Sequence, residues 1–103
     1  MRKNNRLLLW LLPVVLFPSL LMAASTIDGQ LVYDRNCAMC HGAQGVSVMA
    51  SAPSFKRGDG LFKSDTSLRD RIRTGKSACP PFIGRLKDQQ IYDVISYLRT
   101  LYP

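Results

Sequence analysis

Three side chains within five residues carry the clearest chemical signal in this chain: Cys37, Cys40 and His41. The spacing Cys-x-x-Cys-His is typical of covalent haem attachment. Two thiols three positions apart at the end of a helix can reach both vinyl groups of one porphyrin, and the adjacent imidazole then points at the iron. We therefore predict one covalent haem c, with Cys37 and Cys40 as thioether tethers and His41 as a ligand of the iron.

Two other chemistries remain open for the same residues. Together with Cys79 they have the ligand count of a Cys₃His zinc site, although the adjacent Cys40 and His41 rarely reach one small tetrahedral ion together. Cys37 and Cys40 could also be a thioredoxin-like redox pair, but no βαβ pattern surrounds them. His41 is the only histidine of the chain, so a haem with two histidine ligands is excluded.

The elements that must position these residues are predicted to be three helices. The first covers about residues 28–36, and the second covers about 66–74 with Asp65 or Thr66 as its N-cap. The third covers about residues 88–101. Its apolar residues recur at the spacing of one buried helix face: Ile91, Val94, Ile95, Leu98 and Leu101.

Long loops, 42–64 and 75–86, separate the predicted helices, and no stretch alternates as a strand would. We predict an all-α fold of three or more helices, with long loops wrapped around one haem. Without the first 24 residues the chain has 79, a size at which a core is often marginal without a disulfide, metal or cofactor.

Residues 1–24 are predicted to be a secretory signal peptide, and residues 25–103 the haem domain. A basic start precedes an uncharged apolar run at 7–21, and Ala23, Ala24 and Ser25 supply small residues for cleavage. Fifteen apolar residues are short for a membrane span, although retention as an uncleaved anchor stays open. Cleavage after Ala24 leaves the large Met22 three positions back, whereas cleavage after Ser25 puts Ala23 there. We expect a periplasmic location.

Charge predicts the kind of partner. Without the first 24 residues the chain has 11 Lys and Arg against 7 Asp, a net charge of +4. A basic surface favours docking to redox proteins with an acidic face. An exported chain without interleaved basic and aromatic residues is not expected to bind nucleic acid. A membrane contact is expected only if the leader is retained.

The order of these features resembles class I cytochromes c over nearly all of the chain after the leader, about Asp28 to Leu101. The shared order is Gly-x-x-x-Tyr, Cys-x-x-Cys-His, a proline-containing loop, a helix, Gly-x-x-x-ligand-Pro, and a helix with Tyr-Leu. The resemblance implies that the carbonyl of Pro53 accepts the ring N–H of His41. It also implies that the first and last helices cross at Gly29, Tyr33, Val94, Tyr97 and Leu98.

The chain departs from the family at the second iron ligand. Where the family usually has Met-Pro, this chain has Cys79-Pro80. Cys79 is predicted to bind the iron as a thiolate, which favours the ferric state and lowers the potential. Alternatively, Cys79 stays off the iron, or Met49 replaces it. The remaining pocket walls are predicted to be aromatic: Phe55, Phe62 and Phe82.

The function that follows is a periplasmic monohaem carrier of single electrons, cycling between Fe(III) and Fe(II), and not an enzyme. Two alternatives rest on Cys79. Some thiosulfate-oxidising cytochromes resemble this chain in having a His/Cys haem, which would make it a haem subunit of a sulfur-compound-oxidising enzyme. If Cys79 instead leaves the iron, the chain could be a haem sensor for a diatomic gas.

Overall fold

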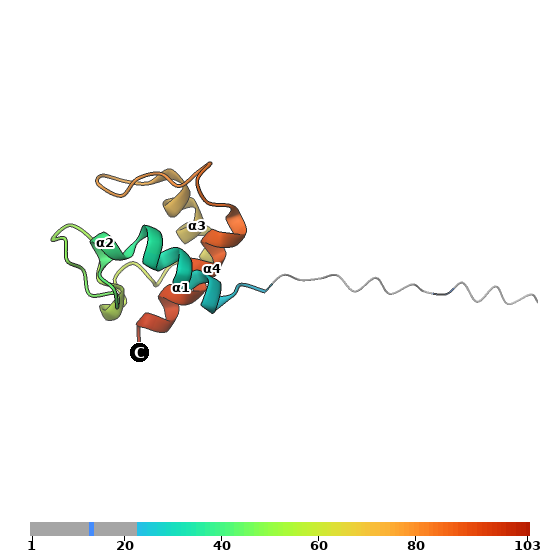
Figure 1. Ribbon diagram of the computed structural model, residues 1–103, viewed down its shortest axis with the longest axis horizontal. Coiled ribbons are helices and arrows are strands. Elements are labelled where there is room, and N and C mark those ends of the chain that lie inside the picture. Colours follow the sequence, from blue (N-terminus) through green and yellow to red (C-terminus); the bar gives the residue numbers. More distant parts are fainter. Residues whose placement is uncertain (1–12, 14–22) are drawn as a thin grey trace, which may run out of the picture.

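The computed structural model describes residue 13 and residues 23–103, so the predicted leader lies almost wholly outside it. Four α-helices follow one another: α1 (Thr26–Asn36), α2 (Ala38–His41), α3 (Asp65–Thr74) and α4 (Asp88–Leu101) (Figure 1). A single 3₁₀ turn, η1 (Phe55–Arg57), lies in the long loop between α2 and α3. Within residues 23–103 extended pairing is limited to one isolated bridge, so the all-α prediction is confirmed.

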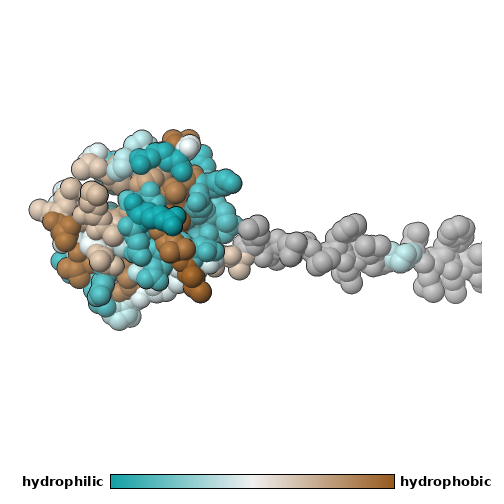
Figure 2. Space-filling model, viewed as in Figure 1, coloured by the Kyte–Doolittle hydropathy of each residue, from teal (hydrophilic) through white to brown (hydrophobic). Residues whose placement is uncertain are grey.

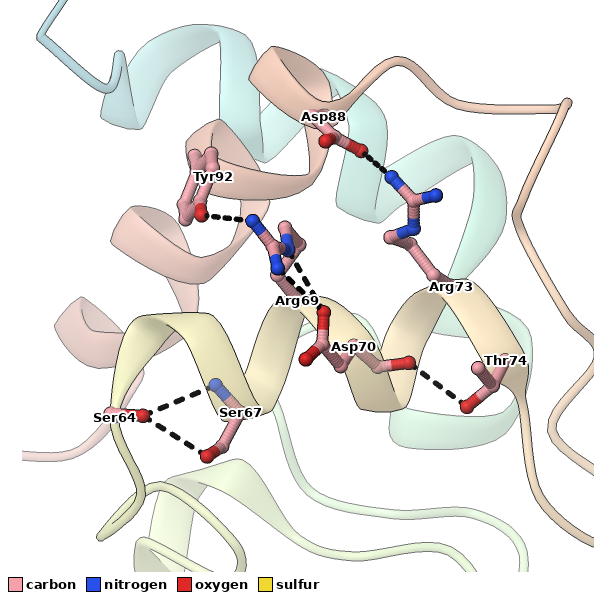
Figure 3. Close-up of polar contacts among 8 residues, drawn as sticks. All are labelled: Ser64, Ser67, Arg69, Asp70, Arg73, Thr74, Asp88 and Tyr92. Carbon is pink, nitrogen blue, oxygen red and sulfur yellow. Dashed lines mark hydrogen bonds and ion pairs between the residues drawn. The ribbon is translucent and has the colours of Figure 1, made fainter.

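Serine side chains determine where two of the helices begin. The hydroxyl of Ser25 accepts the N–H of Asp28 at 3.1 Å, so α1 begins two residues before its predicted start. Ser64 accepts the N–H of Ser67 at 3.1 Å and caps α3, whereas Asp65 or Thr66 was the predicted cap (Figure 3). Both differences have one cause, since a serine hydroxyl satisfies a helix N–H that would otherwise lack a partner.

The first and last helices cross in close contact. A Cβ on Gly29 would lie 1.9 Å from the backbone oxygen of Asp93, so only glycine permits this approach. Nearby, the rings of Tyr33 and Tyr97 lie 5.3 Å apart between centroids. The crossing implied by the family resemblance is therefore present. The buried core around it consists of Tyr33, Leu61, Val94 and Leu98.

Helix α3 packs against residues 88–95 of α4, and the loop that follows α3 leads to the start of α4. Leu68 packs with Ile91 and Ile95 in a second buried cluster. At the surface, Arg73 pairs with Asp88 at 2.5 Å and Arg69 donates to the hydroxyl of Tyr92 at 3.0 Å; Figure 3 shows both contacts, which α3 makes with α4. These contacts fix the carboxyl end of α3, from which the loop containing Cys79 begins.

The surface mixes polar and apolar residues. In Figure 2, apolar colours gather at the left of the view, where Figure 1 shows the loop after α2. That loop exposes Val46, Val48 and Met49, at 59%, 73% and 39% of their surface. Among the helices of the described residues, none combines the length and the hydropathy that a membrane span requires.

Candidate haem site

One cavity of about 420 Å³ brings together the predicted tethers, the predicted iron ligands and two further predicted contacts, Pro53 and Phe82. They come from two separate parts of the chain, the segment that runs through α2 and the loop after it, and the loop between α3 and α4. The predicted residues that line the cavity are Cys37, Cys40, His41, Met49, Pro53, Cys79 and Phe82.

The Cys-x-x-Cys-His segment is held tightly against α1. Cys37 ends α1 by donating its N–H to the carbonyl of Tyr33 at 2.8 Å, and α2 begins at the next residue. The buried hydroxyl of Tyr33 donates in turn to the carbonyl of Gly42 at 2.6 Å, just beyond α2. Burial raises the pKa of Tyr33 to about 12, so its hydroxyl keeps its proton at neutral pH. Tyr33 therefore pins both ends of the short helix.

The imidazole of His41 is oriented from two sides. Its Nδ1 lies 2.9 Å from the carbonyl oxygen of Pro53, the contact that the family resemblance implied. Because a carbonyl only accepts hydrogen bonds, Nδ1 is the donor of this bond, and in the neutral imidazole the lone pair that can bind a metal is then on Nε2. The ring of Phe55 stacks on the imidazole with a centroid separation of 4.4 Å and an interplanar angle of 20°. One ring nitrogen of His41 is thus held by a backbone carbonyl and the other is available, which is the usual arrangement of a histidine that binds a metal.

The sulfur of Cys37 is shielded from water and lies near the other two cysteines. Burial raises the pKa of Cys37 to about 12, and the neighbouring Cys79 and Cys40 raise it further. None of the three cysteines forms a disulfide in the described part of the chain. Within residues 23–103, no three His, Cys, Asp or Glu side chains gather into a group that could hold a metal ion.

Cys79 lies in a backbone hairpin that follows α3. Lys76 and Cys79 exchange two N–H to carbonyl bonds of 3.0 Å each, so Ser77 and the next residue form a two-residue turn. Gly75, which has φ +68°, begins the hairpin, and a Cβ there would lie 2.6 Å from the carbonyl oxygen of Cys79. The N–H of Phe82 donates to Ile72 at 3.2 Å and ties the loop back to α3.

Met49, the alternative ligand predicted from the sequence, differs in position from Met39 of the Cys-x-x-Cys-His segment. Met49 lines the cavity and is 39% exposed, so it lies at the rim, whereas Met39 is 90% exposed and lies outside the cavity lining. The half-buried Cys79 also lines the cavity, with Sγ 3.9 Å from the carbonyl oxygen of Pro80. Cys79 and Met49, the two residues predicted as candidates for the second iron ligand, therefore both line the cavity.

One aromatic prediction is wrong. Phe62 is 81% exposed and packs edge-on against Tyr102 at 5.7 Å between ring centroids, away from the cavity. Leu61, its neighbour, enters the core instead, and adjacent residues of a loop turn to opposite sides. Phe55 and Phe82 do line the cavity, and Phe82 is buried.

Arg71 is a site residue that sequence analysis missed. It lines the cavity, and its buried Nη1 has no hydrogen-bond partner among the described residues. A buried guanidinium nitrogen needs an acceptor, preferably an anionic one. The two carboxylates that a haem carries are of this kind, so the lining fits the group. The available signal was spacing, because Leu68, Arg71 and Ile72 lie three and four residues apart on one face of α3.

Comparisons with known proteins identify the family. Residues 24–98 match the family model described as cytochrome C oxidase, cbb3-type, subunit III. Cytochrome c6 of Nostoc sp. is 34% identical over 80% of this chain and 76% of its own length, and that of Thermostichus vulcanus is 38% identical over 82% and 80%.

Solved structures agree on the fold. Cytochrome c6 from the diatom Phaeodactylum tricornutum aligns with a TM-score of 0.63 at 28% identity, over 75% of this chain and 93% of its own. KustC0563 c-type cytochrome aligns with a TM-score of 0.66 at 22% identity over 74% and 99%, which supports the fold alone. With its Cys-x-x-Cys-His segment, the chain belongs to the class I c-type cytochromes, electron carriers with one covalently bound haem c.

Proposed function

We propose that this chain is an exported, periplasmic carrier of single electrons whose haem iron is bound by His41 and Cys79. One observation carries the ligand assignment: the cavity that contains the Cys-x-x-Cys-His segment is also lined by Cys79, on a loop whose backbone is fixed. The leader over residues 1–24 is inferred from the basic start, the apolar run and the small residues that follow it, which leaves residues 25–103 as the haem domain.

The residues of the cavity divide the work of holding the group. Cys37 and Cys40 would hold it covalently, with Nε2 of His41 and Sγ of Cys79 as the iron ligands. When bound, haem c supplies one-electron exchange between Fe(III) and Fe(II). A thiolate ligand donates charge and lowers the potential relative to methionine, and ligand choice covers a range of about 0.8 V.

The surrounding side chains keep this arrangement in place. The carbonyl of Pro53 and the ring of Phe55 fix the orientation of the proximal imidazole. Phe82, which is 5% exposed, excludes water from the cavity wall. Arg71 supplies the buried positive charge that favours a carboxylate in the cavity. We expect these groups to stay in place during an electron transfer, which would keep the reorganisation energy small.

Partners would approach the cavity from its open side. Lys63 and Lys76 line the cavity, and the exposed apolar side chains of Val46 and Val48 lie on the loop beside it. Basic residues steer a partner with an acidic face, and small apolar contacts then form a short-lived complex. The sulfur-oxidising and gas-sensing alternatives rest on Cys79 alone, and the cytochrome c6 relatives favour the electron carrier.

The ligand assignment is tested by electron paramagnetic resonance of the ferric protein together with a redox titration, in wild type and in Cys79→Met. Wild type should show the compressed spread of g-values of a thiolate ligand and one reversible one-electron couple. Cys79→Met should raise the potential by a few tenths of a volt. Met49→Leu is the matched control and should leave both signals unchanged. A Met-to-iron band in wild type that disappears in Met49→Leu would assign the ligand to Met49 instead.

A further inference from the structure

A buried carboxylate of α4 faces the start of α1. Asp93 is 6% exposed, and its Oδ1 accepts the backbone N–H of Ser25 at 2.8 Å and the amide of Gln89 at 3.0 Å. Within residues 23–103, the ion pairs formed by Lys and Arg involve other carboxylates: Asp59, Asp65, Asp70 and Asp88. The buried Asp93 is thus held by neutral donors only in the described part of the chain.

The negative charge of Asp93 therefore has no compensating cation within residues 23–103. Removing a carboxylate from water is costly unless a cation compensates it, and two neutral N–H groups compensate only in part. The nitrogen of Ser25 already occupies the place where a positive charge would be most effective, 2.8 Å from the carboxylate oxygen. If this nitrogen were a chain terminus, it would be an ammonium group and the pair would become an ion pair.

We propose that the chain is processed between Ala24 and Ser25, and that the new α-ammonium group of Ser25 pairs with Asp93 to lock α1 against α4. This inference rests on the proposed export. Water hydrolyses the peptide bond, Ala24 leaves with the new carboxylate, and the Ser25 nitrogen takes up a proton to become –NH₃⁺. Figure 1 shows the residues just before α1 leading away from the globule, and Ala23 and Ala24 are exposed.

The structure separates this site from the competing cut one residue later. Cleavage after Ser25 would place the smaller Ala23 three positions back, which suits a signal peptidase better than Met22. It would also remove the hydroxyl that caps α1 at Asp28 and the nitrogen that faces Asp93. Cleavage after Ala24 keeps both contacts and strengthens the second, so a chain that begins at Ser25 gives the more stable folded product.

The first test is Edman sequencing and intact-mass measurement of the haem-bearing protein exported by cells that mature c-type cytochromes. The proposal expects Ser-Thr-Ile as the first three residues. A chain that starts at Thr26, at Ala23 or at Met1 and still carries haem would overturn the processing site and leave the electron-carrier function intact. A chain that starts at Ser25 without covalent haem would contradict the proposed function instead, so the two failures differ.

The second test asks whether the terminal charge pairs with Asp93. Asp93→Asn is compared in the processed protein and in a version exported behind a different leader so that it starts at Ala23, where the Ser25 nitrogen is an uncharged amide. In the processed protein the substitution should lower the melting temperature by about 5–10 °C. In the extended version it should leave the melting temperature unchanged or raise it.

The matched control is Asp34→Asn, which removes the same charge from an exposed position of α1. It should change the melting temperature by about 1 °C or less in both backgrounds, in line with other exposed positions. Equal decreases for Asp93→Asn in the two backgrounds, or no decrease in the processed protein, would overturn the pairing of Asp93 with the terminus.

Discussion

The two walls of the haem cavity are built in different ways. On the side of His41, side chains do the holding: Tyr33 bonds the backbone beyond α2, and Phe55 stacks on the imidazole whose Nδ1 meets the carbonyl of Pro53. On the side of Cys79, main-chain groups hold the loop. Two backbone hydrogen bonds between Lys76 and Cys79 form a hairpin, and the N–H of Phe82 bonds to α3. Because the backbone holds this wall, its shape does not depend on the side chain at position 79, and we expect that side chain to be replaceable.

Replacing His41 should have the largest effect, because the proximal wall depends on this side chain. We expect His41→Ala to abolish accumulation of covalent holoprotein, since the chain has no second histidine. The measurement is haem staining of exported protein after denaturing electrophoresis. Met39→Ala changes a 90% exposed residue of the same segment and should leave the stain at the wild-type level. Normal staining of His41→Ala would contradict the importance of the proximal wall.

Replacing Cys79 should be less damaging, because the backbone hairpin remains. Cys79→Ala should retain covalent haem but leave an open position that binds carbon monoxide rapidly in the reduced protein, as followed by stopped-flow absorbance. The comparison between the walls fails if Cys79→Ala loses its haem as completely as His41→Ala does. Ligation by Cys79 fails if wild type binds carbon monoxide just as rapidly.

The hairpin itself can be distorted at Gly75. An alanine there would adopt an unfavourable φ of +68° and place its Cβ 2.6 Å from backbone atoms of Cys79 and Pro81. We expect Gly75→Ala to lower the free energy of unfolding by about 3 kcal/mol, with a change in the ferric spectrum. Gly84→Ala is the control, with φ +77° and nothing within 4 Å of the added Cβ. It should lose about 1 kcal/mol in chemical denaturation and keep the spectrum. Equal losses would show that contact with the Cys79 loop does not matter.

Substitution of Ser77 should have the smallest effect, and it should raise the free energy of unfolding instead of lowering it. It has φ +55°, a left-handed conformation that costs a non-glycine residue about 1–2 kcal/mol. Ser77→Gly relieves this strain but adds freedom to the unfolded chain, so we expect a net gain of about 0.5 kcal/mol in chemical denaturation. The His41 side should be unaffected. A loss of stability would mean that the serine side chain, and not the turn, holds the hairpin.

The features that could be predicted from the sequence are those whose residues recur at a regular spacing. Both ends of α4, 88–101, agree with the prediction because its apolar stripe is long and regular. The Cys-x-x-Cys-His segment identified one end of the cavity, and the family resemblance located Pro53 and Cys79 in its lining. Whether these residues bind haem as proposed stays a prediction that the experiments above address.

What the sequence could not show depends on packing between distant segments. Helix α2 has only four residues, too few for any periodicity, and it exists because Tyr33 and the end of α1 hold it. The exposure of Phe62 and the burial of its neighbour Leu61 are decided by which side of the loop meets α4. Arg71 looked like one more surface charge on α3 until the cavity showed its unpartnered nitrogen.

The close crossing at Gly29 joins the two ends of the domain. Ser25 meets Asp93 across 68 positions of sequence, so nearly the whole chain must be present before this contact forms. Closing so long a loop carries an entropic penalty, which is offset only when α4 packs against α1. A chain that is synthesised from its amino end therefore lacks the contact between Ser25 and Asp93 until the residues of α4 have emerged. Under the export that we propose, such a delay would keep the chain unfolded until it has crossed the membrane.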